Sequence, residues 1–202
     1  MTAKTLILGI GNVLWADEGF GPRCVEALAA SWSFGPDVRI LDGGTQGLYL
    51  LPFLEEADNL LVFDAVDYDL APGTLKVVEN GEVPAFLGAK KMSLHQTGFQ
   101  DVIATAKLME YCPARLLLIG CQPEELEDYG GGLRDGTAAR IPDAIAIAID
   151  RLAAWGVMPV AESRAVIDLA DPAISRGAYE AGRPSEKVAC RIGDARFLPG
   201  RD

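Results

Sequence analysis

The sequence predicts an α/β protein: a single domain of three layers, with a twisted, mostly parallel sheet of about five strands flanked by helices. Two observations predict this class. Short β-like runs alternate with segments of helical period over the first 155 residues, and some runs are apolar almost throughout, as in strands covered on both faces. The length of 202 residues, half of them hydrophobic, is also enough for one substantial core.

Apolar periodicity assigns the individual elements. The predicted strands are residues 5–10, 38–41, 60–66, 74–78 and 115–121, and the predicted helices are residues 20–32, 48–56, 97–109 and 138–155. After Gly156 the chain becomes rich in Gly, Pro, Arg and Ser and loses any sustained period. We therefore predict an α/β domain over residues 1–156 and an irregular, extended or partly disordered C-terminal extension over residues 157–202.

Charge and cysteine content restrict the partners and the compartment. The net charge of −11 lies entirely in residues 1–156, which hold 22 acidic and 11 basic residues, whereas residues 157–202 hold 7 of each. An acidic body argues against nucleic acid and anionic membranes as partners, although solubility alone would also explain the charge. The four cysteines form no C-x-x-C pair, and we see no signal peptide or membrane-spanning run, so we expect a cytoplasmic protein.

The stretch LGIGNVLWADEGFG, residues 8–21, follows the first predicted strand and resembles a nucleotide-binding loop in part. Gly9 and Gly11 match the first two glycines of G-x-G-x-x-G, but Leu14 stands at the third position. Asp17 and Glu18 would repel a pyrophosphate at the start of the next helix. We therefore favour a carboxylate platform over dinucleotide binding, and expect one of the two acids to cap the helix while the other stays available.

Other polar residues follow further predicted strands. Asp42 ends the second strand and Asp64 the third, so parallel strands would bring both to the same sheet edge as Asp17 or Glu18. The single histidine, His95, lies in SLHQ, a capping-box pattern that predicts a neutral ring in the first turn of a helix. A surface or packing role for His95 is the alternative.

This donor set limits the chemistry of the predicted edge. A single histidine excludes H-E-x-x-H zinc sites and two-histidine iron sites, whereas two carboxylates and one imidazole suit a weakly held divalent ion such as nickel or zinc. The acidic, glycine-rich loop over residues 124–133 is either a lid beside this site or a solvated turn.

Four motifs in register carry a resemblance to a known family. GIGNVLWADEGFG, LDGGTQG, VFDAVD and SLHQTG occur in the order and at the separations of the hydrogenase maturation proteases, over about residues 4–155. The chain resembles in particular the branch that serves membrane-bound uptake hydrogenases. The resemblance implies a phosphorylase/hydrolase-like α/β fold and a hydrolase that trims the C-terminal extension of the [NiFe]-hydrogenase large-subunit precursor after nickel insertion.

The resemblance also implies roles for individual residues. It places the contacts to nickel on Glu18, Asp64 and His95, and so selects Glu18 over Asp17. It implies that Asp42 acts near the scissile bond, with His95 as a second candidate for catalysis. The family is often classed with the aspartyl proteases. We expect nickel to be recognised in the substrate rather than held tightly by the free enzyme, and the enzyme to be a monomer.

Two other functions remain open at this point. The chain could be a non-catalytic, nickel-sensing chaperone of the same precursor, which would form a complex without shortening it. It could also be a nucleotide-binding oxidoreductase, although Asp17 and Glu18 fit that function less well.

Overall fold

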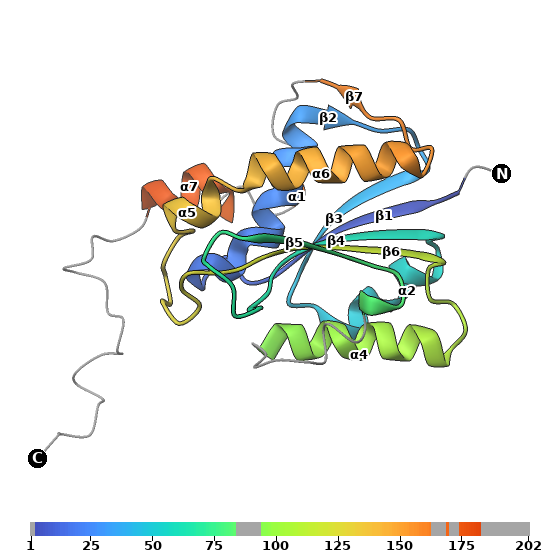
Figure 1. Cartoon of the computed structure of the whole chain (residues 1–202), viewed down its shortest axis with the longest axis horizontal. Helices are drawn as coiled ribbons and strands as arrows, with labels where there is room; N and C mark the ends of the chain where they lie inside the picture. Colours follow the sequence, from blue (N-terminus) through green and yellow to red (C-terminus); the bar gives the residue numbers. More distant parts are fainter. Residues whose placement is uncertain (1–2, 84–93, 163–168, 170–173, 183–202) are drawn as a thin grey trace, which may run out of the picture.

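The computed structural model describes residues 3–83, 94–162, 169 and 174–182, with the backbone alone for residues 94–98. Its centre is a five-stranded sheet in the order β3-β1-β4-β6-β5 (Figure 1). The strands are β1 (Thr5–Ile10), β3 (Val38–Gly44), β4 (Asn59–Ala65), β5 (Leu75–Glu79) and β6 (Arg115–Cys121). The first four in the sheet order pair in parallel and β5 pairs antiparallel with β6, so the predicted mostly parallel sheet is confirmed.

Helices cover both faces of this sheet (Figure 1). Helices α1 (Phe20–Ser31) and α6 (Ile141–Ala154) pack on one face, here called the α1 face, and α2 (Leu51–Glu55) and α4 (Leu94–Leu108) on the other, the α4 face. The three-layer prediction is therefore confirmed.

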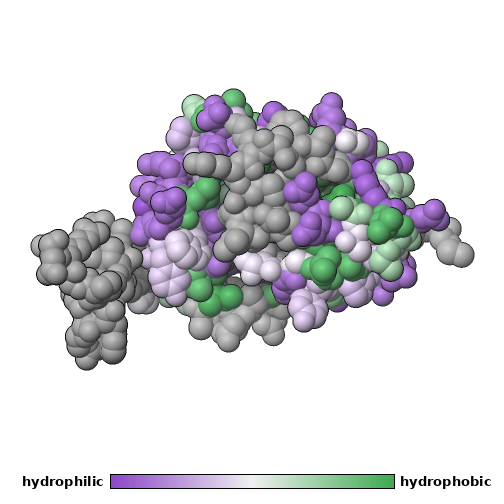
Figure 2. All heavy atoms as spheres, turned by 90° about the horizontal axis from the view of Figure 1, so that it is seen from below, coloured by the Kyte–Doolittle hydropathy of each residue, from purple (hydrophilic) through white to green (hydrophobic). Residues whose placement is uncertain are grey.

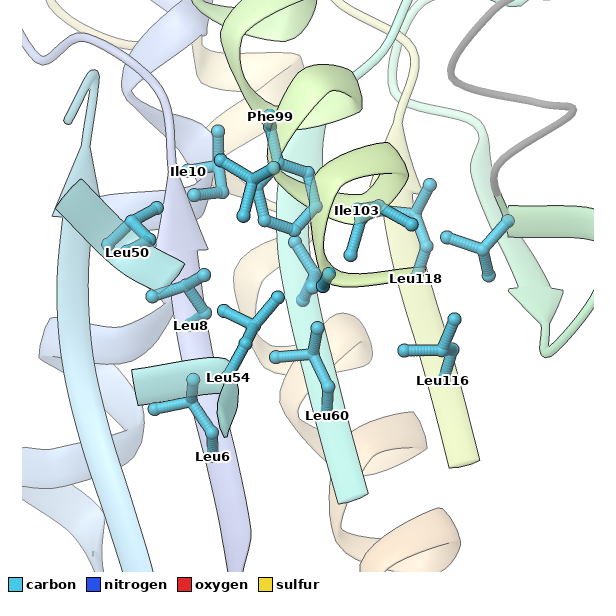
Figure 3. Close-up of a cluster of buried hydrophobic side chains, with 14 of the residues drawn as sticks. Leu6, Leu8, Ile10, Leu50, Leu54, Leu60, Phe99, Ile103, Leu116 and Leu118 are labelled. Atoms are coloured by element: carbon cyan, nitrogen blue, oxygen red, sulfur yellow. The ribbon is translucent and has the colours of Figure 1, made fainter. Parts of the chain in front are cut away.

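Strand residues alternate between these two faces, as a pleated strand requires. Leu6, Leu8, Leu60 and Leu116 join the core under α4 (Figure 3), whereas Ile7, Leu61, Phe63 and Leu117 join the core under α1 and α6. This parity determines which face each polar residue at a strand end belongs to.

Three predicted helices have different bounds in the structure. The predicted helix 48–56 begins as a 3-10 turn, η2 (Gly47–Leu50), and only then becomes α2. The helix predicted from residue 97 already begins at Leu94. The predicted helix 138–155 is two helices, α5 (Asp135–Ala138) and α6, and Pro142 lies in the first turn of α6, where its missing N–H costs nothing.

The described part of the C-terminal extension is more ordered than the sequence predicts. Val160–Ala161 forms β7, which pairs with β2 (Trp32–Ser33), and Arg176–Gly182 forms α7. The start of α7 is held on α1: Arg23 Nη1 donates to the carbonyl of Ile174 at 2.7 Å, and the Arg176 N–H donates to Glu26 Oε1 at 3.0 Å. The expectation of an irregular segment is thus wrong for these residues, while the domain division at residue 156 stays a prediction.

We predict that deleting residues 160–202 leaves a folded protein. Among the described residues of this segment, helix α7 has no buried residue, both strands of the β2–β7 ribbon are only two residues long, and only Leu169 packs, partly buried, against the core of the α1 face, so little of their apolar contact is lost. We expect the thermal midpoint to fall by less than about 10 °C, the range of one to two kcal/mol for a chain of this size. Thermal unfolding of the truncated and full-length chains, followed by circular dichroism, measures this. An insoluble truncated chain would contradict it.

The surface of the described residues is mixed in character. Seen from the α4 side, hydrophobic and hydrophilic side chains are interspersed (Figure 2). None of the helices in the described part of the chain combines the length and apolar character that crossing a lipid bilayer requires. The three described cysteines, Cys24, Cys112 and Cys121, are free thiols.

Candidate active site at the carboxyl edge of the sheet

The glycines of the first loop allow close packing of backbone on backbone. A Cβ on Gly21 would lie 2.2 Å from the carbonyl oxygen of Ile10 and 2.3 Å from that of Phe63, so α1 begins directly against the ends of β1 and β4. Gly11 has φ +138°, and a Cβ there would lie 1.8 Å from the Glu18 carbonyl oxygen. The loop therefore holds the 3-10 turn η1 (Ala16–Gly19) against the carboxyl edge of the sheet.

Asp17 is buried and fastens this turn to the loop that follows β6. Its Oδ2 accepts hydrogen bonds from the backbone N–H groups of Glu124 and Glu125 at 2.8 and 3.1 Å, and its Oδ1 accepts one from that of Arg134 at 2.8 Å. Neither η1 nor α1 has a side-chain cap. The expectation that Asp17 or Glu18 caps the helix is therefore wrong, because Asp17 binds donors more than a hundred residues away in sequence.

The same contacts attach the acidic loop 124–133 to the first loop of the chain. The loop is bound by Asp17, and Tyr129 forms an isolated β-bridge with Trp15 and a tilted ring contact at 5.2 Å between centroids. Glu124, Glu127 and Tyr129 are exposed, so the loop is partly solvated, and its role as a lid stays a prediction. The loop borders the carboxyl edge of the sheet and is attached to the loop that carries Glu18.

Asp42 and Asp64 lie at the same edge, as predicted. Asp42 pairs with Gly9 of β1, which pairs with Phe63 of β4, so the Cα atoms of Asp42 and Asp64 are about 10 Å apart across two strand spacings. Strand parity, however, assigns them to opposite faces. Asp64 shares the α4 face with Leu60, and Asp42 shares the α1 face with Ile40.

The surroundings of Asp42 agree with this assignment. Its Oδ1 accepts a hydrogen bond from the Gly44 N–H at 2.9 Å, and its charge interacts with Arg23 and Glu26 of α1. Burial raises the pKa of the Asp42 carboxyl above its ordinary value; the Gly44 N–H and Arg23 oppose that rise, and Glu26 adds to it. A carboxyl with a raised pKa is suited to accepting a proton.

The backbone brings three predicted site residues to one region. Asp64 is fully buried near the end of β4, and Glu18, 8% exposed, lies in η1, which contacts β4. Helix α4 ends shortly before β6 begins at the opposite edge, so its first turn, which contains His95, lies at the carboxyl edge on the face of Asp64 (Figure 1). The side chain of His95 and its predicted capping residue Ser93 lie outside the described residues.

No group of three or more His, Cys, Asp or Glu side chains that could hold a metal occurs among the residues whose side chains are described. Since that search does not include the imidazole of His95, the predicted set of Glu18, Asp64 and His95 stays a prediction.

Two residues that the sequence did not single out also shape the edge. Gln122, just after β6, accepts the N–H of Tyr68 at 2.6 Å and donates to Asp67 Oδ1 at 3.0 Å, which ties the end of β4 to the end of β6. Tyr68 is 7% exposed and its ring lies over Gly120. No motif signals either residue, because their contacts depend on strand order.

The fold and the edge together define a three-layer α/β protein that carries the acidic residues Asp17, Asp42 and Asp64 at the carboxyl end of its sheet. A family model described as hydrogenase maturation protease (HycI) matches residues 22–151, and the chain belongs to this family.

Relatives support the assignment over nearly the whole chain. The hydrogenase expression/formation protein HupD of Rhodobacter capsulatus is 64% identical over 196 residues, covering 97% of this chain and 93% of the relative. The protein HoxM of Azotobacter vinelandii, described in the same words, is 57% identical over 200 residues, covering 98% and 97%. The solved structure of the hydrogenase maturating endopeptidase HybD from Escherichia coli superposes with a TM-score of 0.75 at 37% identity, covering 79% of this chain and 98% of HybD.

Family membership confirms the central sequence-based predictions. The protein is a hydrolase, an endopeptidase of hydrogenase maturation, and the resemblance to the uptake-hydrogenase branch agrees with the HupD relative. The oxidoreductase alternative is set aside.

Proposed function

We propose that this endopeptidase removes the C-terminal extension of the [NiFe]-hydrogenase large-subunit precursor in the cytoplasm, once nickel has been inserted. Nickel is then cargo of the substrate, and the enzyme contacts it through Glu18, Asp64 and His95. The observation that supports this proposal is that η1, which contacts β4, the end of β4 and the first turn of α4 all lie at one edge of the sheet.

The donor set supports recognition of nickel in the substrate over tight binding by the free enzyme. Two carboxylates and one imidazole bind a borderline transition metal without the thiolates that would hold it firmly. The described cysteines give no such cage: Cys24 and Cys121 are buried, and burial raises the pKa of both thiols. Firm coordination then requires ligands from the precursor, so a precursor without nickel forms fewer contacts and is not selected.

Hydrolysis of the peptide bond requires three functions from the site. The scissile carbonyl must be positioned and polarised, a water must lose a proton as it attacks, and the leaving amine must gain one. We assign the proton-accepting act to Asp42, which makes this an aspartyl-type mechanism. His95 either contacts nickel or donates a proton to the amine, since one imidazole cannot do both at once.

We predict that two variants of α1, Arg23→Gln and Glu26→Gln, shift the loss of activity at low pH, the acid limb of the pH–activity profile, in opposite directions. If ionised Asp42 accepts the proton, activity falls as pH drops through its pKa, which burial raises above 3.8. Arg23 lowers this pKa and Glu26 raises it. Arg23→Gln should therefore move the limb to higher pH, and Glu26→Gln to lower pH.

The measurement is kcat/KM against pH for both variants and the wild type. The two side chains contact each other at 2.8 Å, so each variant is the natural control for the other. Equal shifts in the same direction would contradict the role of Asp42.

Purified protein and nickel-loaded precursor test the proposed function. A large subunit shortened at one site near its C-terminus, identified by intact-mass spectrometry, is the expected result. A stable complex with a precursor of unchanged mass would instead support the nickel-sensing chaperone. Size-exclusion chromatography with light scattering, run on the same samples, tests the expected monomer.

A further inference from the structure

Large apolar side chains are exposed around the carboxyl edge of the sheet. Every strand that pairs in parallel is followed by at least one of them: Leu14 after β1, Leu48 and Tyr49 after β3, Leu70 after β4 and Tyr129 after β6. Single exposed residues of this kind are ordinary, whereas a group of them on neighbouring loops marks a surface that binds another molecule. The residues after β1 and β6 lie on loops that are bonded to each other.

These two loops bring two aromatic rings together. The ring centroids of Trp15 and Tyr129 lie 5.2 Å apart, and the ring planes are inclined at 59°. Tyr129 is 54% exposed and Trp15 is half-buried, while Leu14, the neighbour of Trp15 in the chain, is 37% exposed. We call the pair of rings the aromatic platform.

Backbone contacts hold the aromatic platform in place. Trp15 and Tyr129 form an isolated antiparallel β-bridge, and the Gly130 N–H donates to the Leu14 carbonyl oxygen at 2.7 Å. Side chains that are fixed in advance lose little conformational entropy when a partner binds. Tryptophan and tyrosine are also among the residue types that contribute most to the binding free energy of protein interfaces.

The surroundings of the platform are acidic. Glu124 and Glu127, on the same loop as Tyr129, are both exposed, and Trp15 directly precedes η1, the turn that carries Glu18. Aromatic faces attract cations, and carboxylates bind them by charge and hydrogen bonding. The platform therefore fits a segment in which a positively charged side chain lies beside an apolar one.

The same charges distinguish between partners. They repel nucleic acid, and a second copy of this chain would bring a further net charge of −11. The precursor, in contrast, is the macromolecule that the proposed function brings to this edge of the sheet.

We propose that the aromatic platform binds the hydrogenase precursor outside the candidate catalytic residues, through a precursor segment that carries a basic side chain beside an apolar one. The inference rests on the proposed function for the identity of the partner, and on the Trp15–Tyr129 contact and the exposed carboxylates for its chemistry. The platform selects the precursor and takes no part in the chemical step. Its loss therefore weakens binding and leaves the turnover of saturated enzyme unchanged.

Tyr129→Ala and Tyr129→Phe test the ring. Alanine removes it, whereas phenylalanine keeps it, and neither change removes the backbone bridge to Trp15. For Tyr129→Ala we expect KM for nickel-loaded precursor to rise about 10- to 30-fold with kcat unchanged, and for Tyr129→Phe a KM within about twofold of wild type. Leu108→Ala is the matched control, since Leu108 is 85% exposed at the end of α4, at the opposite edge of the sheet. It should leave KM unchanged.

The double variant Glu124→Gln/Glu127→Gln tests the charge, because glutamine keeps the shape of glutamate. We expect weaker binding of the precursor at low salt and a smaller loss of affinity as salt is added than in the wild type. Glu55→Gln/Glu56→Gln is the control, a pair of exposed acids at the end of α2, before β4 begins at the opposite edge. It should change neither quantity.

Binding of nickel-free precursor, followed by biolayer interferometry, gives a readout that does not depend on cleavage, because the platform lies outside the predicted nickel contacts. Failure of the wild type to cleave nickel-loaded precursor counts against the proposed function. A Kd for nickel-free precursor that is about 10- to 30-fold higher in Tyr129→Ala than in the wild type then still supports the inference. An equal Kd in both proteins overturns it, as does a wild type that binds no precursor. A dimer in light scattering that Tyr129→Ala dissociates would show that a second copy occupies the platform, and would overturn it too.

Discussion

Asp64→Asn is expected to reduce processing of the precursor by about a hundred- to a thousandfold while leaving the protein folded. The side chain is fully buried near the end of β4, and asparagine keeps its shape but cannot ionise. Removal of a group that stabilises the transition state directly typically costs 10²- to 10³-fold or more. Loss of a buried charge does not itself destabilise the fold, because burying a carboxylate is costly in the first place.

Single-turnover cleavage and thermal unfolding, measured on the same preparation, separate the two effects. Asp101→Asn is the control, since Asp101 is an exposed acid on α4, the helix that begins beside the site. Cleavage by Asp64→Asn at the wild-type rate would remove Asp64 from the site. His95→Ala is expected to match Asp64→Asn in activity, and a rate near wild type would remove His95 in the same way.

Asp17→Ala is expected to lower stability by about 3–5 kcal/mol, because it leaves three backbone N–H groups without their buried acceptor. For a chain of this length that corresponds to a fall in thermal midpoint of about 10 °C or more. The same change releases the loop 124–133, which borders the carboxyl edge of the sheet, and the adjoining Arg134. We therefore also expect weaker binding of the precursor.

Denaturant titration of Asp17→Ala and Asp101→Ala measures the difference between a buried and an exposed carboxylate. A loss below about 1 kcal/mol for Asp17→Ala would show that water replaces the carboxylate without penalty.

The sheet could be predicted because its signal is local. The runs at residues 5–10 and 115–121 are apolar almost throughout, and the structure places β1 and β6 at those bounds. Helix bounds were harder, since apolar periodicity continues across breaks in the backbone. The apolar period of α6 extends back to Ala138, so the sequence predicts one helix from that residue. In the structure α5 ends at Ala138 and α6 begins at Ile141, directly before Pro142.

The candidate site could be predicted only to the level of an edge. Parallel strands that end in Asp42 and Asp64 must bring both to one end of the sheet, and they do. Their separation onto two faces follows from strand parity, which depends on bounds that the sequence fixes only to within a residue or two.

The partners of Asp17 and Tyr68 could not be predicted at all. The donors to Asp17 follow β6, and the glycine beneath Tyr68 lies on β6, so both contacts depend on β6 being the neighbour of β4. A helix N-terminus next to an acid predicts a cap by default, and here the longer-range donors replaced it.

The most direct test of the account is cleavage by metal-stripped enzyme of precursor with and without nickel. The protein is purified with chelator, the chelator is removed, and both precursors are supplied at equal concentration, with the shortened large subunit measured over time. We predict efficient cleavage of the nickel-loaded precursor and none of the nickel-free form. Efficient cleavage of nickel-free precursor would contradict the account, and so would tightly bound, stoichiometric zinc whose removal abolishes activity.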